Sequence, residues 1–132
     1  MFRYLTSIFL VGGMSLLPLA AQADTRLMMA EEPGCMWCAR WHSEIGTIYG
    51  KTGEGEAAPL YRVDLTDPLP EGVTLVRTVN FTPTFILLKQ NTEIARIEGY
   101  PGEDFFWALL GQMLRDHDVD FVVKTKAADP ES

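Results

Sequence analysis

The sequence predicts an α/β domain in which a mixed four-stranded sheet carries helices on both faces, in the order β-α-β-α-β-β-α. Three observations predict this class. A strand, a helix and a second strand open the domain, which indicates a parallel crossover. Gln90-Asn91 lies between two apolar runs and resembles a hairpin turn, so it adds an antiparallel strand. An amphipathic stretch at 101–116 then supplies a helix to cover the sheet.

The first 23 residues have the pattern of a cleaved export signal. An apolar run at 5–19 follows Arg3, and Ala21 and Ala23 place small residues where a signal peptidase requires them. A retained membrane anchor is the alternative, but glycines and a proline interrupt the run, and a bilayer span needs about 20 apolar residues. We therefore expect cleavage after Ala23 and a mature protein in the periplasm or another extracytoplasmic space.

The rest of the chain has the size of one small domain. We expect a single domain at 24–123, because a chain of about 100 residues can bury well over half of its extended surface. The polar residues at 124–132 are expected to form a flexible tail. The full chain has a net charge of −7 and no basic run. This argues against binding to nucleic acid or to an anionic membrane, which requires clustered Lys or Arg.

Local patterns predict the first half of the domain. Residues 25–32 form a short apolar run that ends at Pro33-Gly34, as a strand does. Apolar residues then recur at helical spacing over 35–49. The glycine-rich stretch at 50–59 is expected to be a loop. Residues 59–67 alternate and end at Asp67-Pro68, which predicts the second strand.

The second half is predicted in the same way. Residues 71–80 are expected to form a short helix with three valines on one side, although β-branched residues are poor helix formers. Two apolar strands follow at 82–90 and 92–100. The final helix at 101–116 carries acidic residues in its first turn and Arg115 in its last turn, which suits the helix dipole.

Cys35 and Cys38 are the two cysteines of the chain, and both lie at the predicted start of a helix. At this spacing their Cα atoms are roughly 5 Å apart, within disulfide range. Free backbone N–H groups at a helix start favour an anion, so they are expected to lower the pKa of Cys35 and make it the nucleophile. Cys38, one turn deeper, would then resolve the mixed disulfide.

A Cys-x-x-Cys pair can also hold a haem or a metal ion, or form a structural disulfide. A c-type haem site needs His after the second cysteine, but Ala39 follows, which excludes it. A zinc site needs four ligands, and only His42 and His117 could complete the pair. A purely structural disulfide would close a very small loop and stabilise little. Zinc and a structural disulfide stay open as alternatives, but a redox dithiol without metal or cofactor is expected.

Three motifs give the chain a resemblance to the thioredoxin superfamily over about 26–115. They are Cys35-Met36-Trp37-Cys38 at a helix start, Thr82-Pro83-Thr84 before a strand, and Gly99-Tyr100 before the last helix. The resemblance implies that the Thr82-Pro83 bond is cis, that Pro83 faces the disulfide, and that the backbone of Thr82 binds a client strand. Either Trp37 or Trp41 is expected to lie at the edge of the groove that binds the client, and Trp37 is the candidate binding residue. An ordinary trans proline at the strand start is the alternative.

Departures from ordinary thioredoxins narrow the resemblance. Those proteins have Gly-Pro between the cysteines and a buried Asp that accepts a proton from the second cysteine, whereas this chain has Met36-Trp37 and Met29 at these positions. The stretch from Pro33 to Trp41 is similar to the exported thioredoxin-like (SoxS-like) proteins encoded with bacterial sulfur-oxidation genes. The resemblance to these proteins implies that a membrane thiol electron donor re-reduces the cysteines and that a sulfur-carrier protein is the client.

We therefore expect an extracytoplasmic thiol-disulfide oxidoreductase that mainly reduces a disulfide or modified cysteine of a client protein. Glu31 and Glu32 precede the cysteines and oppose a thiolate, so the potential is expected near about −270 mV rather than about −120 mV. A disulfide isomerase and a redox-regulated binding module are the alternatives. His42 could exchange a proton with Cys38, or be an ordinary surface histidine. Glu31 or Glu32 could replace the missing acid, or be simply solvated.

Overall fold

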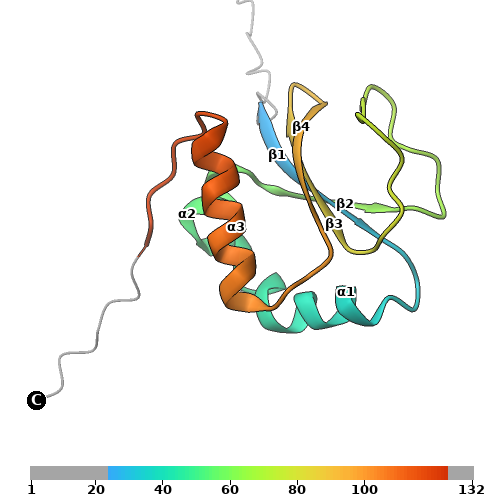
Figure 1. Ribbon diagram of the computed structural model, residues 1–132, viewed down its shortest axis with the longest axis horizontal. Helices are drawn as coiled ribbons and strands as arrows, with labels where there is room; N and C mark the ends of the chain where they lie inside the picture. The colour runs from blue at the N-terminus through green and yellow to red at the C-terminus, as the bar shows by residue number, and fades with distance from the viewer. Residues whose placement is uncertain (1–23, 125–132) are drawn as a thin grey trace, which may run out of the picture.

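The computed structural model describes residues 24–124, so the expected export signal and residues 125–132 of the expected tail lie outside the described residues. Figure 1 shows the sheet with α3 against one side and α1 at one end. The elements in chain order are β1 (Thr25–Glu31), α1 (Met36–Trp41), the π-helix η1 (His42–Gly46), the 3-10 helix η2 (Tyr49–Lys51), α2 (Gly53–Ala57), β2 (Leu60–Asp64), β3 (Thr84–Lys89), β4 (Thr92–Glu98) and α3 (Glu103–Asp116).

The predicted mixed four-stranded sheet is confirmed, with the strand order β2-β1-β3-β4. β1 pairs in parallel with β2 and antiparallel with β3. β3 and β4 form an antiparallel hairpin. At its turn Gln90 and Asn91 both have positive φ angles, 50° and 63°. Two consecutive left-handed residues match the twist of the flanking strands, which explains why this dipeptide connects them.

The two faces of the sheet bury different clusters. Alternate residues of β1 and β3, such as Leu27 and Phe85, face a core that also contains Trp41 and Phe106 from the helices. The other residues, such as Met28, face a smaller cluster on the opposite side. This alternation follows from the two-residue period of a strand. Because the central strands are covered on both faces, they read as continuous apolar runs.

The helix predicted at 71–80 is wrong. The chain there is irregular, and Thr74 forms an isolated parallel bridge with Thr92 of β4. Val73, Leu75 and Val79 still pack against the smaller cluster, but they do so from an irregular chain of turns and bends. Among the described residues, the helices contribute to the larger core on one face of the sheet, and the segment between β2 and β3 covers the other (Figure 1). The prediction of helices on both faces is therefore corrected, because the segment expected to supply the second layer is not a helix.

The loop predicted at 50–59 is also wrong in part, because it contains α2. The hydroxyl of Thr52 caps this helix by accepting a hydrogen bond from the N–H of Gly55 at 3.0 Å. The glycines that suggested a loop serve close packing instead. A Cβ on Gly55 would lie 1.8 Å from the carbonyl oxygen of Tyr49, and one on Gly53 would lie 1.7 Å from that of Val122.

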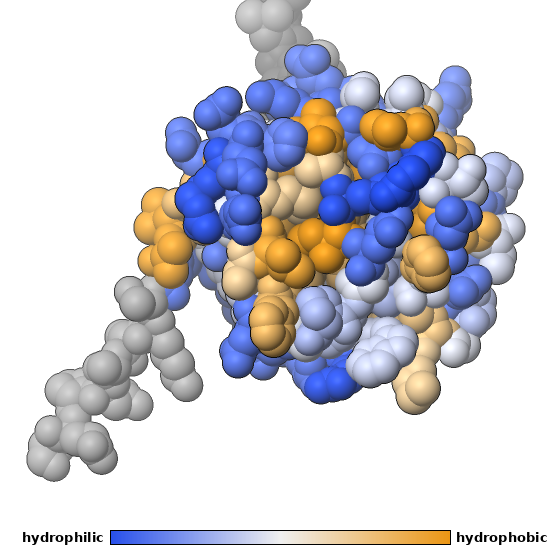
Figure 2. Space-filling view, in the orientation of Figure 1, coloured by the Kyte–Doolittle hydropathy of each residue, from blue (hydrophilic) through white to orange (hydrophobic). Residues whose placement is uncertain are grey.

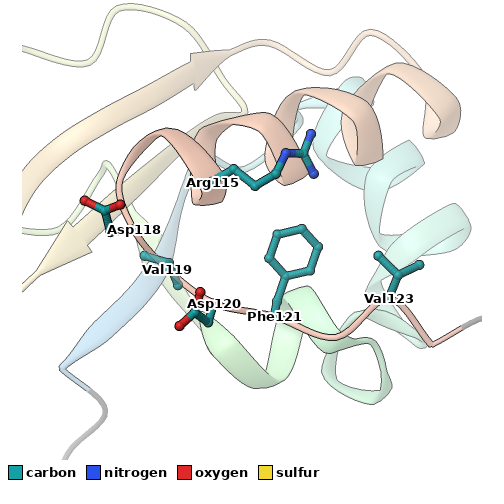
Figure 3. Close-up of a pocket in the computed structure, with 6 residues that line it drawn as sticks. All are labelled: Arg115, Asp118, Val119, Asp120, Phe121 and Val123. Carbon is teal, nitrogen blue, oxygen red and sulfur yellow. The ribbon is translucent and has the colours of Figure 1, made fainter.

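The chain after α3 folds back over the helices. Figure 3 shows the ring of Phe121, from the segment after α3, pointing toward the side chain of Arg115 on α3. The guanidinium lies 5.9 Å from the ring centroid, and both residues line a hollow of about 310 Å³. Val119 and Phe121 pack against the core. In the view of Figure 2, apolar residues lie at the centre of the face with hydrophilic residues on both sides. Within residues 24–124, no helix has the length and apolar character needed to cross a membrane.

A buried ion pair fixes the irregular segment to β4. The Nη2 atom of Arg96 donates to Oε2 of Glu93 at 2.7 Å, and both side chains are almost fully buried. The same carboxylate accepts the N–H of Val76 at 2.8 Å, and Arg96 donates to the carbonyl oxygen of Arg77 at 2.9 Å. Burial alone would raise the pKa of Glu93, but the hydrogen bonds from Arg96 and Val76 hold it below its ordinary value.

Removal of one partner of this pair is expected to destabilise the fold strongly. Arg96→Met leaves the Glu93 carboxylate buried without a cation, which typically costs about 3–5 kcal/mol. Urea unfolding of the oxidised protein measures the loss. Arg77→Met is the control, because Arg77 is half-exposed where it pairs with Glu98, and such pairs are worth about 1 kcal/mol or less. Equal, small losses of unfolding free energy in both variants would contradict the assignment of Glu93 and Arg96 as a buried ion pair.

Candidate active site

Cys35 and Cys38 form a disulfide at the start of α1, with 5.2 Å between their Cα atoms. Cys35 has an extended backbone and occupies the N-cap position of the helix. Its Sγ accepts a hydrogen bond from the backbone N–H of Cys38 at 3.1 Å. That N–H is one of the donors that a helix start leaves without a partner. The backbone therefore places a donor at the sulfur of Cys35.

The two sulfurs differ in their accessibility. Cys38 belongs to the core and is only 5% exposed. Cys35 is partly buried, and the two residues between them are open to solvent, with Met36 76% and Trp37 49% exposed. A large partner can approach the disulfide from the side of Cys35. The geometry suits thiol-disulfide exchange, in which one thiol attacks a partner and the other closes the internal disulfide.

The two tryptophans of α1 have separate positions. Trp41 is completely buried, and its ring centroid lies 5.4 Å from that of Phe85 in the core. Trp37 lies at the surface beside the disulfide, with the guanidinium of Arg40 5.5 Å from its ring centroid. Nε of Arg40 also donates to Glu44 at 2.8 Å. Arg40 therefore packs along the exposed side of the helix and helps to hold Trp37 there.

The Thr82-Pro83 peptide bond is cis, and Pro83 is buried. The hydroxyl of Thr82 donates to Oε1 of Glu32 at 2.9 Å. Glu32 belongs to the turn that leads into Cys35, and its carbonyl oxygen accepts the N–H of Cys35 at 3.3 Å. This side-chain bond connects two segments that are 50 residues apart in sequence. The structure thus brings Thr82 close to the turn that carries the cysteines.

A hollow of about 350 Å³ lies beside Thr82 and is also lined by Phe81, Glu98 and Gly99. Phe81 was missed by the sequence reasoning, although an aromatic residue directly before Thr-Pro was a usable signal. Its side chain is 62% exposed. Gly99 has a φ of 84°, a left-handed conformation that favours glycine. Glu98 pairs with Arg77 at 2.8 Å, so its charge is balanced.

Tyr100 follows this hollow and connects it to the helix after the cysteines. Its side chain is buried, and its hydroxyl donates to the carboxylate of Glu44 in η1. Burial, and then the hydrogen bond to Glu44, raise the pKa of Tyr100. Since Glu44 also binds Arg40, a continuous set of contacts leads from Trp37 to the chain that precedes α3.

Glu31 is not a simply solvated carboxylate, because its side chain is only 16% exposed. Nε2 of His42 lies 2.9 Å from Oε2 of Glu31, and Nε of Arg62 donates to the same oxygen at 3.3 Å. Burial alone would raise the pKa of Glu31, but hydrogen bonds from Arg62 and His42 outweigh it and lower the pKa. Glu32 remains exposed. Among residues 24–124, no cluster of His, Cys, Asp or Glu is arranged to hold a metal ion.

Comparison with solved structures found the crystal structure of the reduced periplasmic thioredoxin SoxS from Paracoccus pantotrophus. It is 51% identical with a TM-score of 0.69, and the match covers 71% of this chain and 99% of that chain. A thioredoxin from Malassezia sympodialis was also found at 18% identity and a TM-score of 0.47, covering 68% of this chain and 75% of its own. Thioredoxin-2 of the malaria parasite was found at 22% identity and a TM-score of 0.47, and the match covers 67% of this chain and 82% of that chain. Comparison with protein-family models and with curated proteins gave no match.

The Glu31 contacts predict a pH-dependent part of the stability. The pKa of Glu31 is below its ordinary value of 4.5 in the folded protein. The unfolded chain therefore binds this proton first as the pH falls, so Glu31 stabilises the fold above about pH 4.5 and less in acid. Urea unfolding at pH 7 and pH 3 is expected to show a large loss for Glu31→Gln at pH 7 that shrinks at pH 3. A loss that is independent of pH would contradict this.

Proposed function

This chain belongs to the thioredoxin superfamily as a SoxS-like member, and from that premise we propose that it reduces disulfides or modified cysteines of client proteins outside the cytoplasm. The chain is a thiol-disulfide oxidoreductase, as its Cys-x-x-Cys pair and the match to SoxS indicate. The observation that carries the proposal is the backbone N–H at the sulfur of the more accessible cysteine. It supports Cys35 as the residue that attacks the client.

The proposed reaction has two exchange steps. The Cys35 thiolate attacks one sulfur of the client disulfide, the new bond joins Cys35 to the client, and the other client sulfur leaves with the electron pair. The Cys38 thiolate then attacks Sγ of Cys35. The internal disulfide forms, and the first client sulfur leaves as a thiolate. The client gains two electrons and this protein loses two.

Trp37, Thr82 and Pro83 are proposed to bind the client around the disulfide. The bond between Thr82 and Glu32 supports this role, because it holds the cis-proline loop next to the turn before Cys35. The exposed ring of Trp37 offers apolar surface next to the cysteines. The hollow beside Phe81 has room for a client side chain. A partner chain between these residues would place its disulfide at Cys35.

The reducing direction and the compartment are proposals that rest on charge and on sequence. Residues between the cysteines are uncharged, and Glu31 and Glu32 disfavour a strongly stabilised thiolate, which fits a donor of electrons. The apolar stretch with Arg3 and Ala23 supports export, and the matched SoxS is periplasmic. A membrane thiol donor is proposed to re-reduce the pair, and a sulfur-carrier protein is the proposed client.

Trapping of a mixed disulfide tests the function. Cys38→Ser should accumulate a covalent complex with reduction-sensitive clients in an extracytoplasmic extract, because the second exchange step is removed. Cys35→Ser is the matched control and should trap none. Non-reducing electrophoresis and mass spectrometry of the adducts measure both variants.

Two outcomes would contradict the proposal. Equal trapping by both variants would show that Cys35 is not the attacking residue. A reduction potential near about −120 mV in a glutathione titration, rather than near about −270 mV, would indicate an oxidase instead of a reductase.

A further inference from the structure

The second exchange step raises a question that the cysteines alone do not answer. Cys38 is almost completely buried, so its thiol must lose a proton to a nearby group before it attacks Cys35. Where ordinary thioredoxins have an acid, this chain has Met29, which is fully buried in the same core cluster as Cys38. A thioether cannot accept this proton. Another group must therefore take it.

His42 lies one helical turn after Cys38. The backbone N–H of His42 donates to the carbonyl oxygen of Cys38, so the helix is continuous between them. Residues four apart on a helix lie on the same face, with about 5–6 Å between their Cβ atoms. The imidazole is partly buried, and its Nε2 is held by Glu31 at 2.9 Å. His42 is therefore an ionisable side chain on the same helical face as Cys38.

The sheet beneath the helix supplies the charges that face His42. Met29 and Arg62 are neighbours in the parallel register of β1 and β2, and Glu31 is two residues beyond Met29 on the same face. That face is the one on which α1 packs. Arg62 binds Glu31 rather than the imidazole. On the helix itself, Arg40 and Glu44 bind each other. Glu31 is thus the charged group in contact with His42.

We propose that His42, oriented by Glu31, accepts the proton of Cys38 when Cys38 attacks the mixed disulfide. Nε2 donates its hydrogen to the Glu31 carboxylate, so Nδ1 is the free acceptor, and the proton moves to it from the Cys38 thiol through one water. The thiolate then attacks Sγ of Cys35, and the client sulfur that leaves can take the proton back from the imidazolium. No other reactant is needed. The inference rests on the proposed function, because it concerns the same dithiol.

The contacts explain why His42 rather than Glu31 has this role. Glu31 is held as a carboxylate by Arg62 and His42, and its lowered pKa makes it a poor proton acceptor. A carboxylate next to an imidazole fixes the ring and stabilises the imidazolium that forms. Glu31 is accordingly a positioning residue. This arrangement differs from a single buried acid, because the proton acceptor lies on the helix and its anchor lies on the sheet.

Stopped-flow reaction of the reduced protein with the aromatic disulfide DTNB separates the two exchange steps. The first phase depends on DTNB concentration and reports attack by Cys35, while the second is independent of concentration and reports attack by Cys38. In His42→Gln the second phase is expected to slow about 100-fold at pH 7, at the low end of the effect of a general base. The first phase should keep the wild-type rate, which also shows that the variant is folded.

The pH profile distinguishes proton transfer from a structural role. In the wild type, the second phase is expected to reach a plateau once the acceptor is free of its proton. In His42→Gln that plateau should be lost, with a rate that keeps rising with pH as the thiol ionises. Glu31→Gln should give a smaller slowing, because it only loosens the imidazole. His117→Gln, at the other histidine of the chain, is the matched control and should change neither phase.

The inference would be overturned if His42→Gln kept the wild-type rate and pH profile of the second phase. If His42→Gln does not fold, an unchanged second phase in Glu31→Gln would overturn it instead. Neither result would affect the proposed function. Failure of Cys38→Ser to trap a client would instead remove the proposed function, because that variant does not depend on His42. The two failures are therefore distinguishable.

Discussion

The hydrogen bond from the N–H of Cys38 to Sγ of Cys35 is the interaction on which the site depends. It exists because β1 ends at Glu31, the chain turns at Gly34 with a φ of 80°, and the helix then begins with Cys35 at its cap. A parallel crossover to β2 holds that turn at the end of the sheet. The sulfur that we propose as the nucleophile is therefore placed by backbone geometry, next to an N–H group of the helix start.

Long-range contacts assemble the rest of the site around this turn. Glu32 on one side accepts the hydroxyl of Thr82, and Glu31 on the other side binds His42 and Arg62. Two adjacent carboxylates thus have different partners. Glu32 binds Thr82, which is proposed to contact the client, and Glu31 binds His42, which is proposed to accept the proton of Cys38.

Local patterns were sufficient to predict the strands, the hairpin and the cysteines at a helix start, because each depends on residues close in sequence. The pattern of Val73 and Val79 does not identify a helix, because valines six apart can pack on a cluster from an irregular chain as well. The hydrogen bonds of Glu93 and Arg96 hold the segment in that irregular form. The Glu31 contacts could not be predicted. They require the register that places Arg62 beside Met29, which only the assembled sheet defines.

The account is tested most directly by the pH dependence of Cys35 alkylation. The Cys38→Ser variant keeps the backbone N–H at position 38 and leaves a single thiol, so iodoacetamide reports on Cys35 alone. The rate is expected to reach half its maximum at a pH below about 8.5, the value for a free cysteine. A midpoint at or above that value would show that the helix start does not stabilise the thiolate, which would contradict the central claim.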